Sequence, residues 1–166
     1  MHYLDDYLTH ALGAALNAAR ELGEAVAAHV DLVHDDDVRH NVEEAGALMD
    51  EHVDIVDALL REGGHAVEWE PSRPVSALFE ELDIALEVIA APELSDAAVL
   101  AATHAALHVV RATYAGIRCQ AAHLGRYDVV RDLDLALSDS DTAIAALHGI
   151  TETCLGRALR RSSAPA

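Results

Sequence analysis

Apolar residues recur along this chain at the spacing of a helix that packs into a bundle. Between Ser95 and Gly125 two heptad lines run without a proline; one is Leu100, Leu107, Tyr114, Ala121, and the other is Thr103, Val110, Ile117, Leu124. Such lines make the narrow apolar seam of a bundle helix. Ser95 is a suitable N-cap and Gly125 a suitable stop, so the pattern predicts one long helix over residues 95–125.

Three further segments, at about 4–33, 37–61 and 127–160, carry the same pattern and predict three more long helices. Their seams are Leu8, Leu12, Ala15, Ala19, Leu22, Val26, His29, Val33; then Val38, Val42, Ala45, Met49, His52, Val56, Leu59; and last Val130, Leu133, Leu137, Ser140, Ile144, Leu147, Thr151, Cys154, Ala158. The acidic run at 35–37 leaves only a tight turn between the first two helices. We therefore expect them to form an antiparallel pair.

A longer connection, residues 63–95, separates the second and third long helices. It carries a short predicted helix, about 75–90, which is apolar over much of its circumference and should be widely buried, against the bundle or a second subunit. The connection is long enough to cross the bundle, so the helices that it joins should run parallel. We predict an all-α, ferritin-like up-down four-helix bundle whose long crossover carries a short fifth helix. It forms a single domain over residues 1–160, with a frayed tail at 161–166.

Composition and charge narrow the classes of partner. Hydrophobic residues make up 52% and aromatic residues only 4%, which suits alanine-rich helices better than sheets. The formal net charge of −18 argues against nucleic acid or an anionic membrane as a partner. No signal peptide and no membrane-spanning run is evident, so we expect a cytoplasmic protein. Cys119 and Cys154 fall on different predicted helices and are expected to be free, buried thiols.

Eleven histidines raise the question of a metal site. The strongest local motif is His104-x3-His108, an i,i+4 pair that can hold one ion on a helix face. His104 shares its heptad line with Arg111 and Arg118, which should be a solvated flank, and His108 lies beside the seam. We therefore favour surface or flank histidines over a metal site at this motif.

A relocated metal site is the alternative. If the second and third long helices are parallel, a His-rich set comes to similar heights and would bind iron or zinc; its members are Glu44, His52, His104 and His108. His29 and His52 are the only strongly polar residues on their seams. We expect both to be core histidines whose nitrogens are hydrogen-bonded or partly exposed.

A hemerythrin-like arrangement is a second form of the same alternative. His40-x3-Glu44 and His123-x4-Asp128 flank the His104-x3-His108 pair in the order of the hemerythrin series. The last motif spans the predicted stop at Gly125, so it does not present one helical face. We do not favour this interpretation.

The stretch 96–125, DAAVLAATHAALHVVRATYAGIRCQAAHLG, is similar without a gap to the third helix of the ferritin-like bacterial stress-response family typified by YciE and YciF. The similarity includes the Asp96 turn, His108, Tyr114 and Leu124-Gly125, and extends more loosely to the second and final helices. The resemblance implies a ferritin-like bundle and, in typical members, a di-iron centre held by inward glutamates.

This chain departs from the family at those ligands. Leu107 and Val110 stand where the third helix of the family has its inward glutamates; elsewhere the family's acidic positions fall on or near Ala19, Ala47, Leu48, Asp139 and Ser140. The seam independently places Leu107 and Val110 in the core. We therefore expect a non-catalytic, degenerate bundle of the stress-response type with no di-iron centre and no other cofactor. We also expect a homodimer formed through the bundle or the crossover helix.

Overall fold

The protein folds into four long helices and one short helix. The computed structural model describes residues 2–66 and 68–162, and side chains for residues 5–66 and 68–157. The elements are α1 (His2–His29), a 3-10 turn η1 (Val30–Leu32), α2 (Asp36–Glu62), α3 (Arg73–Val88), α4 (Pro92–His123) and α5 (Tyr127–Ser162). No strand is present in the described residues, so the all-α prediction is confirmed.

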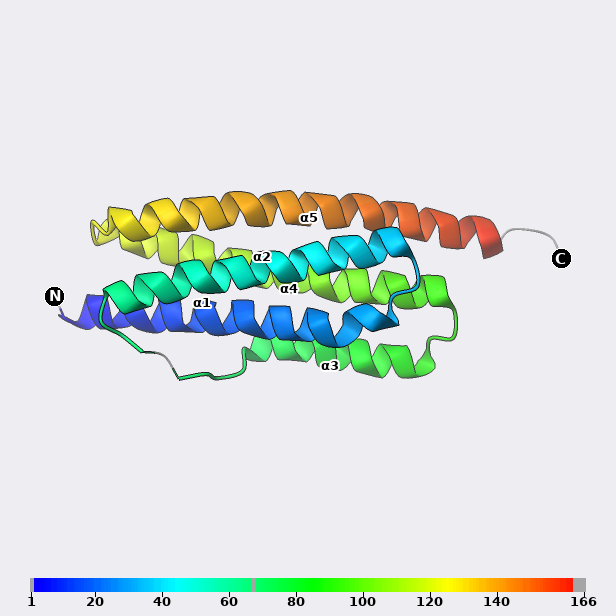
Figure 1. The fold of residues 1–166 in the computed structure, drawn as a ribbon, viewed down its shortest axis with the longest axis horizontal. Coiled ribbons are helices and arrows are strands. Elements are labelled where there is room, and N and C mark those ends of the chain that lie inside the picture. Colours follow the sequence, from blue (N-terminus) through cyan, green and yellow to red (C-terminus); the bar gives the residue numbers. More distant parts are fainter. Residues whose placement is uncertain (1, 67, 163–166) are drawn as a thin grey trace.

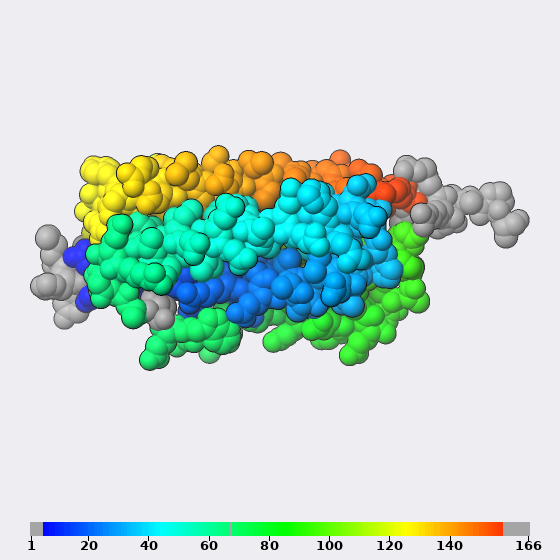
Figure 2. All heavy atoms as spheres, in the orientation of Figure 1, coloured from blue at the N-terminus to red at the C-terminus, as the bar shows by residue number. Residues whose placement is uncertain are grey.

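The helices form a bundle with one crossover (Figure 1). α1 and α2 are an antiparallel pair, α4 and α5 are a second antiparallel pair, and α2 runs in the same direction as α4. The connection from α2 to α4 returns along the length of the bundle, and its helix α3 packs outside the bundle against α1 and α4. Figure 2 shows α2 and α5 lying along each other on the front face, above the α3 region. The ferritin-like topology predicted from the sequence is confirmed.

The apolar seams form the core. Every residue of the first two predicted seams is buried, and both heptad lines of the third are buried except for the half-buried Leu124. On α5 the innermost line differs from the prediction, since Val129 and Ala136 are fully buried whereas Val130 and Leu137 are only half-buried. The small Ala136 suits the closest approach between helices, and the larger Leu137 packs at the margin of the apolar face of α5.

Helix ends follow local capping rules, with one correction. The Asp35 carboxylate accepts hydrogen bonds from the backbone N–H groups of the first turn of α2. Gly64 and Gly125 have φ values of 75° and 72° and end α2 and α4 in Schellman turns. The prediction that Ser95 caps α4 is wrong: α4 begins at Pro92, because proline at N1 has a suitable φ and its missing N–H would have no helical partner.

The crossover helix α3 is less buried than its sequence indicates. Val75, Phe79 and Leu82 are buried against the bundle. Ile84 and Val88 are 62% and 83% exposed, so the bundle of the single chain does not bury this face, and burial against a second subunit stays a prediction. α3 packs on one side of the α1–α4 pair, so the face of α3 that points away from the bundle is in solvent.

Close contact between α1 and α2 depends on a glycine. A Cβ atom added at Gly46 would lie 2.9 Å from Cγ1 of Val26, whereas one added at Gly116 on α4 meets nothing within 4 Å. Gly46 therefore allows the two backbones to approach, and Gly116 has no such role. Across the described helices, none is both long enough and apolar enough to cross a bilayer.

Candidate functional site

The centre of the bundle is packed with hydrocarbon at the positions where the family resemblance implies metal ligands. Leu107 and Val110 on α4 are both 0% exposed. Ala19 on α1 is fully buried as well. None of these side chains offers an electron pair to a metal ion, since hard and borderline cations require oxygen, nitrogen or thiolate donors.

The aligned positions on α2 and α5 supply no inward carboxylate either. On α2, Ala47 is exposed and Leu48 is half-buried. On α5, Asp139 is exposed, and the buried Ser140 donates its hydroxyl hydrogen bond to the carbonyl of Ala136 at 2.7 Å. The Ser140 hydroxyl hydrogen is therefore already committed to its own helix.

A histidine and a tyrosine occupy the polar part of the core. The rings of His52 on α2 and Tyr114 on α4 meet edge to face, with centroids 5.4 Å apart and an interplanar angle of 67°. Both side chains are fully buried, and neither the two nitrogens of His52 nor the hydroxyl of Tyr114 has a hydrogen-bond partner. The expectation that the nitrogens of His52 are hydrogen-bonded or partly exposed is therefore wrong.

Burial keeps this pair uncharged. Desolvation lowers the pKa of His52 from 6.5 to about 4, although the Asp139 carboxylate opposes the shift. Desolvation also raises the pKa of the Tyr114 phenol. At neutral pH the core therefore contains a neutral imidazole and a neutral phenol, and burial keeps both from exchanging protons readily with solvent.

These residues do not fit a di-iron centre. Such a centre is built from several inward carboxylates and histidines on facing helices of a bundle. Among the described side chains, the only buried carboxylate belongs to Asp96, and its oxygens accept hydrogen bonds at one end of the bundle. The core is therefore suited to packing and not to binding two iron ions.

Outside the core, α4 and α5 bring three histidines together. The ring centroids of His104 and His108 are 4.8 Å apart, and those of His104 and His148 are 6.2 Å apart. Nε2 of His104 is buried and has no hydrogen-bond partner. Desolvation, followed by the two neighbouring histidines, lowers the pKa of His104, so its ring is neutral at neutral pH.

The histidines continue a ladder of ion pairs between the two helices. Arg118 pairs with Asp134, and one heptad further along each helix Arg111 pairs with Asp141. One more heptad along the same two lines are His104 and His148. The predicted solvated flank is thus confirmed for the arginines, although it faces α5. It also lies next to His148, a histidine that no sequence motif indicated.

The structure does not assemble the four-residue metal set proposed as the alternative. His52 meets Tyr114, which lies six residues beyond His108 and therefore about 9 Å further along the axis of α4. Glu44 is exposed on α2, where its carboxylate lies 3.3 Å from Nε2 of His40. In the described part of the chain, no three histidine, cysteine or carboxylate side chains converge closely enough to hold an ion.

The hemerythrin-like motifs are also separated. Nδ1 of His123 lies 2.8 Å from the carbonyl oxygen of Cys119, one turn earlier on α4. Asp128 pairs instead with Arg126 at 2.8 Å, and that guanidinium lowers the pKa of the Asp128 carboxyl. The polar groups of each motif therefore interact with residues close by in the sequence, and the motifs lie on separate parts of the surface.

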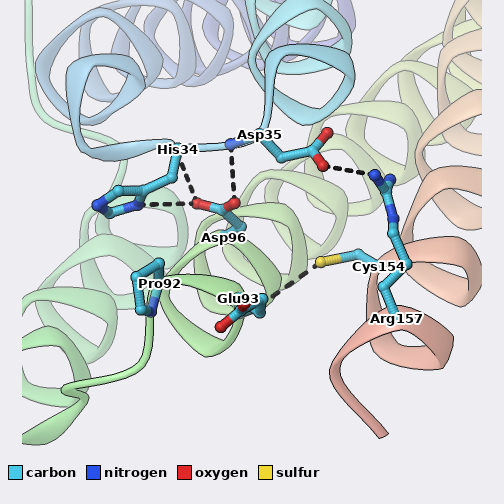
Figure 3. A pocket seen from close by; sticks show the side chains of 7 residues that line it. All are labelled: His34, Asp35, Pro92, Glu93, Asp96, Cys154 and Arg157. Carbon is cyan, nitrogen blue, oxygen red and sulfur yellow. Dashed lines mark hydrogen bonds and ion pairs between the residues drawn. The ribbon is translucent and has the colours of Figure 1, made fainter. Parts of the chain in front are cut away.

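A small cleft of about 160 Å³ lies at the end of the bundle where α1 turns into α2 (Figure 3). Asp96, on the second turn of α4, accepts backbone hydrogen bonds from His34 at 2.8 Å and from Asp35 at 3.0 Å. From α5, Arg157 reaches Asp35 at 2.6 Å. We call these contacts of Asp96 and Arg157 the end latch, because they join the turn of the first hairpin to both helices of the second.

The cysteine beside the end latch is buried and held as a thiol. Burial, reinforced by the Asp96 carboxylate, raises the pKa of the Cys154 thiol, so it is protonated at neutral pH. Its Sγ donates to the carbonyl of Glu93 at 3.6 Å. Both cysteines are free, but Cys119 is exposed, contrary to the expectation that both are buried.

Comparison with known proteins supports the fold. The E. coli stress protein YciF has a structure that matches with a TM-score of 0.84 and 18% identity, over 94% of this chain and 99% of YciF. YcfI from Rhodopseudomonas palustris, described as "a putative structural protein", matches with a TM-score of 0.81 and 22% identity, over 87% of this chain and 92% of YcfI. No curated protein sequence matches the chain.

The family assignment rests on nearly the whole chain. A sequence profile described as "Domain of unknown function (DUF892)" matches residues 3–160, which include all four long helices and the crossover. This match and the YciF structure confirm the resemblance that the helix at 95–125 indicated. The protein therefore belongs to the DUF892 family and has the ferritin-like helical bundle of its relative YciF.

Proposed function

We propose that this protein is a non-catalytic bundle of the stress-response type, in which packing replaces a di-iron centre. The observation that carries the proposal is the complete burial of Leu107 and Val110, at the positions where the family resemblance implies inward glutamates. These two apolar side chains stand there in place of a carboxylate pair. Burial of each one stabilises the fold by roughly 1.5–3 kcal/mol. The stress protein YciF and the structural description of YcfI support a role in this class.

The role also includes self-association. Ile84 and Val88 lie one turn apart on the outer face of α3 and are largely exposed. Two copies that meet through α3 would cover these side chains, which supports a homodimer through the crossover helix. The net charge of −18 and the two free cysteines support a cytoplasmic protein that does not bind nucleic acid.

Iron analysis of the purified protein tests the metal-free core. Protein produced in iron-supplemented medium should contain substoichiometric iron and should not accelerate the oxidation of Fe²⁺ by oxygen. The measurement is made on the wild type and on His52→Leu, since His52 is the one histidine among the described side chains that is fully buried at the centre of the bundle. Two iron ions per chain in the wild type, with a lower iron content in His52→Leu, would overturn the proposal.

A further inference from the structure

A groove of about 410 Å³ lies outside the core, between the first half of α1 and the connection from α2 to α3. The connection passes beside α1 over this stretch (Figure 1). The volume falls within the roughly 300–1,000 Å³ that is typical of small-molecule sites. On the α1 side the lining includes Gly13, which is buried and has no side chain, together with Ala14 and Asn17. Small residues on this side leave room for a ligand. We call this feature the α1 groove.

The unusual group in the α1 groove is Asn17. This residue lines the groove and is only 8% exposed, and its Oδ1 atom has no hydrogen-bond partner among the described residues. Buried polar atoms normally have a partner, because a buried acceptor without one has lost its hydration with nothing in return. An amide oxygen only accepts hydrogen bonds. The partner that Asn17 lacks is therefore a donor, an N–H or an O–H group.

The charges around the α1 groove favour a cationic donor. Three carboxylates line it, that of Asp6 on α1 and those of Glu68 and Glu70 in the connection. The remaining polar lining residues include His10 and His65, and no arginine is among the described residues that line the groove. The net charge of −18 adds a long-range attraction for small cations. A cation that donates hydrogen bonds would meet both the carboxylates and the unpaired amide oxygen.

The carboxylates of the α1 groove do not converge on one point. No group of three histidine, cysteine or carboxylate side chains in the described ranges is placed to hold a metal ion. An organic cation with ammonium groups at separate positions along a hydrocarbon chain can instead face separate carboxylates. Each ammonium group brings three N–H donors. Gly13, Ala14 and Ala66 offer an apolar lining to the hydrocarbon between them.

We propose that the α1 groove binds a linear aliphatic di- or polyamine, whose ammonium groups donate hydrogen bonds to Oδ1 of Asn17 and to the carboxylates of Glu68 and Glu70. Hydrogen bonds from a charged donor are stronger than those between neutral groups, so a few of them suffice for a specific site. The bound amine links α1 to the connection, where both glutamates are exposed. The site is separate from the bundle core and adds to the function proposed above.

Fluorescence of the full-length protein reports on the α1 groove. Trp69, the single tryptophan of the chain, is half-exposed and lies between Glu68 and Glu70 in the sequence, so an amine bound to these carboxylates changes its surroundings. Titration with 1,4-diaminobutane at constant ionic strength should give a saturable change in emission. The diol 1,4-butanediol has the same carbon chain without charge and should give none. The amine 1-butylamine has a single ammonium group and should bind more weakly than the diamine.

Calorimetric titration of variants with 1,4-diaminobutane tests the named groups. Glu68→Gln/Glu70→Gln and Asn17→Leu should each weaken binding by at least about fivefold, since each removes an acceptor of a charged donor. Glu80→Gln/Glu81→Gln is the matched control, because it removes two negative charges from exposed positions of α3 outside the groove. Its affinity should equal that of the wild type. Circular dichroism checks that Asn17→Leu is folded, and the surface variant Glu68→Gln/Glu70→Gln tests the site independently of the buried position.

Three results would overturn the proposal. They are the absence of a saturable response to 1,4-diaminobutane, equal binding of 1,4-butanediol, and an equal loss of affinity in Glu80→Gln/Glu81→Gln and in Glu68→Gln/Glu70→Gln. The last result would show that amines are attracted to the acidic surface as a whole and not to the α1 groove. None of these results depends on the iron content of the core, which tests the function proposed above separately.

Discussion

Replacing His52 with leucine should make the bundle less sensitive to acid. The unfolded chain carries a histidine with a pKa of 6.5, whereas burial lowers the folded-state pKa of His52 to about 4. As the pH falls through this window, the unfolded state takes up a proton before the folded state does. The contribution of His52 is therefore fully present above pH 6.5 and is progressively lost between about pH 6.5 and pH 4.

The size of the effect follows from the same two pKa values. A shift of this size corresponds to roughly 3 kcal/mol over the whole window, at about 1.36 kcal/mol for each pKa unit. Between pH 7 and pH 5 the expected loss is about 2 kcal/mol, a large share of the stability of a typical domain. Leucine at this position does not titrate, so this component disappears. It also leaves no unpaired nitrogen, so His52→Leu should be at least as stable as the wild type at pH 7.

Urea unfolding at pH 7 and pH 5, followed by circular dichroism at the helix band, measures this difference. Fluorescence is less suitable, because the single tryptophan, Trp69, lies in the α2–α3 connection and is 48% exposed. His40→Leu serves as the control, since it removes an exposed histidine and should keep the pH dependence of the wild type. Equal pH dependence in His52→Leu and the wild type would refute the reasoning.

Three further predictions concern packing, the end latch and assembly. Gly46→Ala should destabilise the protein by about 1–2 kcal/mol in urea unfolding, because its methyl group meets a buried valine, whereas Gly116→Ala should stabilise it by about 0.5–1 kcal/mol; a gain at both sites would contradict the close approach of α1 and α2. Asp96→Asn should lower the free energy of unfolding by about 1–3 kcal/mol, since an amide replaces one of the two oxygens that accept backbone N–H groups; an unchanged midpoint would show that the latch is not stabilising. Ile84→Glu/Val88→Glu should yield a folded monomer in light scattering, and a wild type that is already monomeric would contradict assembly through α3.

The helices and their order were predictable because local physics determines them. The heptad lines identified the buried face of α1, α2 and α4, and Gly125 marked the end of α4. The errors arose where two local rules competed. Ser95 is a good N-cap by type, but Pro92 allows α4 to start earlier, and α5 turns its smaller Ala136 inwards in place of Leu137.

The candidate sites were less predictable because they depend on how helices are aligned with each other. His104 and His108 are visible as a motif, but the addition of His148 requires the register between α4 and α5. The opposing heptad lines of arginine and aspartate would have given that register from the sequence. The partnership of His52 with Tyr114 had no comparable signal, since it depends on the diagonal packing of α2 and α4.

The end latch bears on how long the folded protein lasts. Asp96 closes loops of 61 and 62 residues, whereas most contacts within each hairpin lie between helices joined by a short turn. Local contacts form early in folding, and long-range contacts of this kind form after the hairpins dock. Loss of the latch should therefore accelerate unfolding and leave the folding rate nearly unchanged, as expected for an interaction absent from the transition state. One buried carboxylate would thereby lengthen the lifetime of the native state with little effect on the speed at which it forms.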